Sequence, residues 1–252
     1  MKPGEFVWYE LTTGDPQGAA DFYGKVLGWI VKDAGMPGMT YLVAHLGDRP
    51  FAGIMESTPE GTAAPPRKWW GYVAVGDVDA KAELAEAAGG SVVRAPGDIP
   101  GVGRFAVVAD PQGACFMLFK GAGAPAPDLP YMTPGSMGWH QLNAKDWEAV
   151  FPFYQRLFGW EKAEAVDMGG WTYQLLTIAG AVTGAMMTAH QDQAIGWDFY
   201  FAVDDIDAAK GRLEDTGGQV LMGPMEVPGP MWILVAQDPQ GGPFALVGNR
   251  TA

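Results

Sequence analysis

The stretch WYELTTGDPQGAADFYGKVLGW, Trp8 to Trp29, is the most informative part of the sequence because both of its ends recur later in the chain. WYELTTGD at Trp8–Asp15 returns as WHQLNAKD at Trp139–Asp146. FYGKVLGW at Phe22–Trp29 returns as FYQRLFGW at Phe153–Trp160. Both repeats are displaced by 131 residues, which indicates that one segment is copied as a whole.

Two further repeats extend this match along each half of the chain. YVAVGDVDA at Tyr72–Ala80 returns as YFAVDDIDA at Tyr200–Ala208, and DPQG at Asp110–Gly113 returns at Asp238–Gly241. Both are displaced by 128 residues. Matches that keep their register over such a distance predict a duplicated domain.

The boundary between the copies is predicted in a segment rich in Gly and Pro, GAGAPAPDLPYMTPGS at Gly121–Ser136. We therefore expect a first domain at 1–121, a linker at 122–135 and a second domain at 136–252.

The first segment has local signals for a strand followed by a helix. Trp8, Glu10 and Thr12 alternate along a strand pattern with Tyr9, Leu11 and Thr13, so the two sets face opposite sides of the strand. Asp15 is a typical N-cap, and Gly28 is a typical stop signal for the helix that begins at Pro16.

The rest of the first half extends this scheme. Strands are expected around 39–44, 51–55, 69–75, 91–93, 103–108 and 114–119, with a second helix from about Asp79 to Gly89. Because the second half repeats the pattern, the predicted fold class is α+β, with four β-α-β-β-β units that form two domains.

Composition excludes some partners. Lys and Arg number 16 against 29 Asp and Glu, a net charge of −13, so nucleic acid and anionic membrane surfaces would be repelled. The first residues contain no apolar signal core, no stretch is long and apolar enough to span a membrane, and Cys115 is the one cysteine. We expect a cytoplasmic protein.

These motifs resemble the vicinal oxygen chelate superfamily, which includes glyoxalase I, extradiol dioxygenases and bleomycin-resistance-type binding proteins. The resemblance covers nearly the whole chain, once in each half. It implies that each domain is a curved, cup-shaped sheet that holds a small ligand. In metalloenzymes of the family, the cup also holds a divalent metal bound by His, Gln or Glu.

The resemblance also indicates which positions would bind the metal. In the first half they are Trp8, Trp70 and Met117, and in the second half Trp139, Asp198 and Ala245. An indole has no lone pair for a metal, and a thioether is a poor ligand for hard cations. We expect no metal and no other cofactor, and we expect His45, His140 and His190 to pack or lie at the surface.

The cups are instead predicted to bind an apolar or aromatic metabolite or antibiotic. The expected lining is aromatic with a few polar groups: Trp8, Glu10, Thr12, Trp70, Tyr72, Met117 and Phe119 in the first cup, and Trp139, Gln141, Asn143, Asp198 and Tyr200 in the second. The same side chains could instead fill the cups as a core, which would suit a structural or interaction protein.

Glu10 leaves an enzymatic alternative open. Desolvation would raise the pKa of a carboxyl group among Trp and Met side chains, as a general base needs, so an isomerase or lyase is one alternative. A metalloenzyme with displaced ligands is another. Glu10 could also pair with Arg67 or Lys68, or lie at a solvated rim. Assembly as a homodimer is a further expectation.

Overall fold

The computed structural model describes residues 2–57, 68–124, 128–191, 193–229 and 231–251. Arg67 and part of the expected linker, residues 125–127, lie outside these ranges. No helix in the described ranges is long and apolar enough to cross a membrane.

Among its described residues, the first half contains eight strands and two helices: β1 (Phe6–Thr13), α1 (Pro16–Leu27), β2 (Ile30–Asp33), β3 (Tyr41–Leu46), β4 (Arg49–Glu56), β5 (Lys68–Ala74), α2 (Val78–Ala87), β6 (Ser91–Ile99), β7 (Gly103–Ala109) and β8 (Cys115–Gly121). The second half repeats this order: β9 (Met137–Ala144), α3 (Trp147–Phe158), β10 (Glu161–Asp167), β11 (Thr172–Ile178), β12 (Ala181–Thr188), β13 (Gly196–Asp205), α4 (Ile206–Asp215), β14 (Gln219–Val227), β15 (Met231–Gln237) and β16 (Pro243–Asn249).

Strands β1–β8 belong to one eight-stranded sheet and β9–β16 to another. The predicted α+β class with four β-α-β-β-β units is confirmed. The individual expectations missed β2 and ended β6 at Val93 rather than at Ile99. Both segments are largely exposed edge strands and lack the apolar alternation on which the prediction depended.

The chain divides into two compact units that each take elements from both halves of the sequence. Unit 1 comprises Met1–Trp8, Trp70–Pro127 and His140–Trp197, and unit 2 comprises Tyr9–Trp69, Asp128–Trp139 and Asp198–Ala252. The expected boundaries at 121 and 136 follow the repeats and stay a prediction, because compact units group residues by contact instead.

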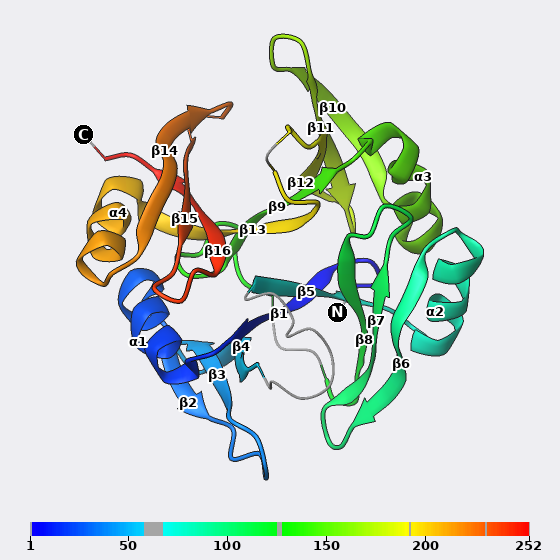
Figure 1. The fold of residues 1–252 in the computed structure, drawn as a ribbon, viewed down its shortest axis with the longest axis horizontal. Helices are drawn as coiled ribbons and strands as arrows, with labels where there is room; N and C mark the ends of the chain where they lie inside the picture. Colours follow the sequence, from blue (N-terminus) through cyan, green and yellow to red (C-terminus); the bar gives the residue numbers. More distant parts are fainter. Residues whose placement is uncertain (1, 58–67, 125–127, 192, 230, 252) are drawn as a thin grey trace. The chain divides into compact units, whose positions relative to one another are not determined.

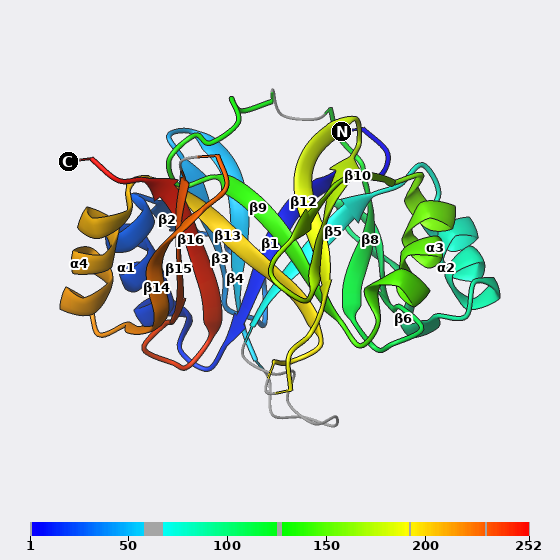
Figure 2. The same ribbon diagram turned by 90° about the horizontal axis from the view of Figure 1, so that it is seen from above.

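Unit 1 contains the strand orders β5-β8-β7-β6 and β9-β12-β11-β10, with α2 and α3 side by side. Unit 2 contains β1-β4-β3-β2 and β13-β16-β15-β14, with α1 and α4 side by side. Figure 1 and Figure 2 both show these helix pairs.

The cap signals of α1 act as expected. The Asp15 carboxylate accepts a hydrogen bond from the Gly18 N–H at 2.9 Å, and Pro16 begins the helix. Gly28 ends it in the left-handed region, with φ of 75°. The second helix begins at Val78 with Asp77 as its cap, because the Asp77 carboxylate accepts from the Ala80 N–H. The expected start near Asp79 was one residue late.

The Asp-Pro-Gln-Gly turn of unit 2 is tied to α1 through a buried hydrogen-bond chain. The Trp69 indole donates to the Tyr23 hydroxyl, which donates to the Asp238 carboxylate, both at 3.0 Å. Asp238 also accepts from the N–H groups of Gln240 and Gly242, which closes the turn. Burial, and then the charge of Asp238, raises the pKa of Tyr23 well above its usual value, so the hydroxyl keeps the proton it donates.

Unit 1 contains the same arrangement from the other copies of the motifs. The Trp197 indole donates to the Tyr154 hydroxyl at 3.2 Å, and Tyr154 donates to Asp110 at 3.0 Å. Burial raises the pKa of Asp110, although the N–H groups of Ala114 and Gln112 favour its charged form. The two motifs that define the repeat therefore meet in space, the helix from one half of the sequence and the turn from the other.

Candidate functional site

An apolar cluster in unit 1, which we call the first apolar wall, collects most of the residues predicted for the first cup. Tyr72, Phe105 and Met117 are buried at its centre, and five partly buried side chains pack against them: Trp8, Trp70, Ile99, Val107 and Phe119. Parallel pairing of β5 with β8 places Tyr72 beside Met117, and β7 adds Val107. Strand alternation turns these side chains to one face.

Aromatic contacts order the first apolar wall. The rings of Tyr72 and Phe119 meet edge to face, with centroids 5.9 Å apart. The Arg94 guanidinium lies 4.7 Å from the centroid of the Phe105 ring. A cation thus covers one end of the wall, which is otherwise aromatic and aliphatic.

Unit 2 contains the equivalent cluster from the second half, the second apolar wall. Tyr200, Ala245 and Val247 are buried, and five partly buried side chains pack against them: Met132, Trp139, Met231, Ile233 and Val235. Tyr200 pairs with Ala245, and Ala245 with Val235, in the register that Tyr72, Met117 and Val107 show in the first wall. Ala245 replaces the longer Met117 at the centre.

The predicted carboxylate of the first half lies in unit 2, in what we call the first polar pair. Glu10 is only 6% exposed, and the Tyr41 hydroxyl donates to its Oε2 at 3.0 Å. Gly53 on β4 pairs with both Glu10 on β1 and Val43 on β3. Because glycine has no side chain, Tyr41, two residues before Val43, can reach across β4 to the carboxylate.

The second polar pair lies in unit 1 and has the same geometry without the charge. The Tyr173 hydroxyl donates to Gln141 Oε1 at 3.0 Å, and Ala185 is the small residue on the strand between them. The Gln141 amide donates to Asn143 Oδ1 at 2.9 Å. At the position equivalent to Asn143, Thr12 donates instead to the Lys68 carbonyl at 3.4 Å.

Sequence reasoning missed both tyrosines. Tyr41 and Tyr173 stand 31 and 32 residues after the Glu10 and Gln141 they contact. A signal was present, because each lies at or next to the start of the alternating strand that follows the first helix and edge strand of its half. The register across three strands was needed to bring each tyrosine to its partner.

The residues that the resemblance assigns to the family's metal positions do not fit a metal in the first half. Met117 lies at the buried centre of the first apolar wall, and Trp8 and Trp70 pack against that centre. An indole offers no lone pair, and a lone thioether binds hard divalent cations poorly.

The donor set of the second half is similarly poor. Trp139 and Ala245 belong to the second apolar wall, and Asp198 is a half-buried carboxylate on β13. Within the described ranges, no three His, Cys, Asp or Glu side chains lie close enough to hold a metal ion together. One carboxylate beside apolar side chains does not make a divalent site.

The other reactive side chains pack elsewhere. The His140 ring stacks on Phe6 with centroids 4.4 Å apart, and burial lowers its pKa to about 4. This is the packing role expected for it. His45 contacts the Val43 carbonyl through Nδ1, and the Cys115 thiol lies 3.7 Å from the Gly113 carbonyl.

The chain belongs to the glyoxalase/bleomycin resistance protein/dioxygenase superfamily, whose family model matches residues 5–118 and again residues 136–246. The tandem repeat and the family predicted from the motifs are thereby confirmed.

Relatives of nearly the same length carry different functional names. A Mycobacterium bovis protein provisionally named glyoxylase CFP32 is 30% identical over 95% of this chain and 93% of its own length. The anthracycline biosynthesis protein DauV of Streptomyces sp. strain C5 is 32% identical over 99% of this chain and 95% of its own. The Mn(II)-bound glyoxalase of Novosphingobium aromaticivorans matches with a TM-score of 0.70 at 16% identity, over 99% of this chain and 83% of its own. This last likeness shows the fold alone.

Proposed function

We propose that this protein binds a flat apolar or aromatic small molecule without a metal ion. The observation that carries the proposal is the composition of the first apolar wall. The resemblance assigns Trp8, Trp70 and Met117 to positions where metalloenzymes of the family have ligands, and these side chains belong to an apolar cluster with Tyr72. Such a surface suits an aromatic ligand, because stacking and apolar burial supply the affinity.

The proposed ligand contacts differ between the two walls. Trp8, Trp70, Tyr72, Met117 and Phe119 would contact one ligand, and Trp139 and Tyr200 would contact another. The smaller Ala245 leaves room for a bulkier substituent than Met117 does.

Polar groups would orient the ligands. We propose that Glu10 and Thr12 favour a ligand with a donor or a positive charge, since a carboxylate only accepts hydrogen bonds when ionised. Gln141, Asn143 and Asp198 would favour a more neutral, hydroxyl-rich ligand. The arrangement of these groups with the apolar walls into one cup for each half stays a prediction.

The name of one relative supports this choice of ligand. DauV is named for anthracycline biosynthesis and is 32% identical over almost the full length of both proteins. An anthracycline has a flat fused-ring system, which is the shape that an aromatic wall accommodates. We propose that polycyclic aromatic compounds of this kind are the first ligands to test.

The test is a fluorescence titration of the chelator-treated protein with doxorubicin, an anthracycline. We expect saturable quenching of tryptophan emission that weakens in Trp8→Ala or Trp139→Ala. Trp232→Ala is the matched control, because Trp232 follows Met231 on β15 and so faces away from the second apolar wall, against Arg250. Binding that requires an added divalent metal, or no binding to any flat aromatic compound, would overturn the proposal.

A second candidate is an isomerase or lyase with Glu10 as general base. One observation favours it: Glu10 is buried, and the Tyr41 hydroxyl holds its carboxylate in a fixed position. Turnover that depends on a single ionisation and disappears in Glu10→Gln, while ligand binding persists, would establish this candidate. A rate unchanged in Glu10→Gln would remove it.

Two further expectations remain proposals. We propose a cytoplasmic location, from the composition, and a homodimer, from the resemblance to the family. Sedimentation of the purified protein tests the dimer, and a monomer at micromolar concentration would contradict it.

A further inference from the structure

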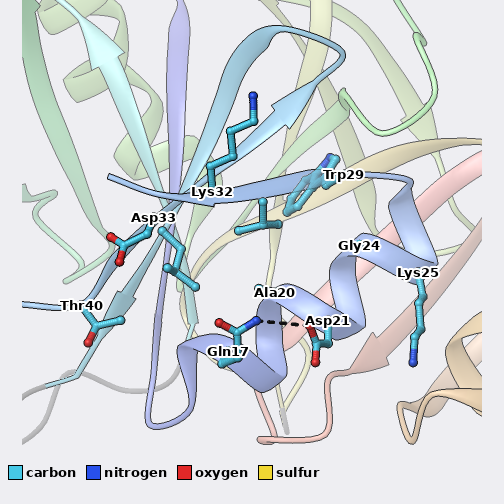
Figure 3. A pocket seen from close by; sticks show the side chains of 11 residues that line it. Gln17, Ala20, Asp21, Gly24, Lys25, Trp29, Lys32, Asp33 and Thr40 are labelled. Carbon is cyan, nitrogen blue, oxygen red and sulfur yellow. Dashed lines mark hydrogen bonds between the residues drawn. The ribbon is translucent and has the colours of Figure 1, made fainter. Parts of the chain in front are cut away.

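A groove in unit 2 lies outside the residues assigned so far, between helix α1 and the strands β2 and β3. Its volume is about 620 Å³, within the range of small-molecule sites. The floor is apolar, formed by Ala20, Gly24, Trp29, Val31 and Leu42. Figure 3 shows the helix on one side of this space and β2 on the other.

The second half of the chain shows which side chains occupy the equivalent space, between α3 and β10. With the displacement of 131 residues, Ala20 and Val31 correspond to Phe151 and Lys162. Phe151 and Trp147 are buried on α3, and the Lys162 ammonium on β10 lies 4.8 and 4.7 Å from their ring centroids. Two aromatic rings and a cation therefore occupy the space between that helix and its edge strand.

The first half lacks these side chains. Pro16 and Ala20 stand where the second half has Trp147 and Phe151, so neither aromatic ring is present. Gly24 adds no side chain to this face of the helix, and a Cβ at this position would lie 3.3 Å from the Trp29 carbonyl oxygen. The groove is open because Pro16 and Ala20 replace the aromatic side chains that fill the equivalent space in the other half.

The charges at the rim favour a cation. Asp21 and Asp33 line the groove together with Lys25 and Lys32. The Asp21 carboxylate accepts from the Gln17 amide at 3.3 Å, and Asp33 accepts from the Gly35 N–H at 2.8 Å. In Figure 3 the ammonium ends of Lys25 and Lys32 point away from the space between α1 and β2, which favours the carboxylates as the groups that meet a cationic ligand there.

We propose that this groove is a second ligand site, which binds a small aromatic ring that carries an ammonium group. The ring would occupy the space over Ala20 and Gly24 that Phe151 fills in the other half. The ammonium group would lie at the rim against Asp21 and Asp33. This site shares no residue with the apolar walls or the polar pairs.

The test measures tryptamine binding by ¹H–¹⁵N correlation spectra of the full chain. We expect saturable shifts of the Gly24 and Val31 amides at concentrations up to about 1 mM. Tryptophol, which replaces the ammonium with a hydroxyl, should bind about fivefold more weakly, because one Coulomb contact in water is worth about that factor. Equal affinity for both probes, or no shifts with tryptamine, would overturn the proposal.

Variants separate the groove from other sites. Ala20→Phe restores the ring that the other half carries at this position, so it should fold and abolish the shifts. Asp33→Asn should weaken tryptamine about fivefold, whereas Asp48→Asn, in the exposed turn after β3, should not. Trp8→Ala should leave the shifts intact, which separates this site from the proposed function. Unchanged binding in both Ala20→Phe and Asp33→Asn would contradict the assignment.

Discussion

Removing one oxygen atom from the core of unit 2 should cost a large share of the protein's stability. The Tyr23 hydroxyl is fully buried and donates to Asp238 while it accepts from the Trp69 indole. In Tyr23→Phe, the carboxylate loses a hydrogen bond worth about 1.5–3 kcal/mol, and the indole N–H is left without this acceptor at a cost of about 1–3 kcal/mol. Partial relaxation should bring the total to about 3 kcal/mol.

The assay is urea unfolding, followed by circular dichroism and tryptophan fluorescence. Tyr154→Phe makes the same change in unit 1, where Tyr154 joins Trp197 to Asp110, and should have a similar cost. Tyr131→Phe is the control, because Tyr131 is 60% exposed and should change the free energy of unfolding by less than about 0.5 kcal/mol. Values for both buried variants within that margin would refute the reasoning.

Three further predictions test other parts of the structure. Burial lowers the pKa of His140 to about 4, against 6.5 in the unfolded chain, so the contribution of the neutral imidazole to stability is fully present above pH 6.5 and is lost as the pH falls through 4. The free energy of unfolding should drop by about 3 kcal/mol over that range, and His140→Phe should remove this part of its pH dependence. Gly135→Ala should destabilise by more than about 2 kcal/mol in urea unfolding, because φ is 82° and the new Cβ would come within 2.7 Å of a backbone carbonyl, whereas Gly38→Ala, with φ of 79° and open space, should cost about 1 kcal/mol. Tyr41→Phe should lower the affinity of a cationic aromatic ligand about tenfold if the Glu10 carboxylate orients it, and an unchanged dissociation constant would exclude that role.

The sequence predicted the elements whose signals are local. Helix α1 follows from Asp15, Pro16 and Gly28, which act within one turn of its ends. Strand β2 was missed because Ile30–Asp33 is a short, exposed edge strand. The motifs indicated the family by resemblance, and their repetition in register predicted a duplicated α+β domain.

Tertiary pairing limited the prediction of the site. The bond between Tyr41 and Glu10 depends on the register of three strands and on Gly53 between them, which no local pattern specifies. The compact units could not be predicted either, since contacts such as that of Tyr23 with Asp238 join residues that are 215 positions apart. The repeats reflect the duplication of a sequence segment, whereas the compact units are defined by contacts between segments that are far apart in the sequence.

We propose that the protein binds its aromatic ligand without a metal, and titration calorimetry combined with metal analysis tests this proposal. Purified protein is treated with a chelator, analysed for Zn, Ni, Fe and Mn, and titrated with doxorubicin in a calorimeter before and after each metal is restored. We predict the same dissociation constant in every case and a clear loss of affinity in Trp8→Ala. A stoichiometric metal that must be present for binding would contradict the account.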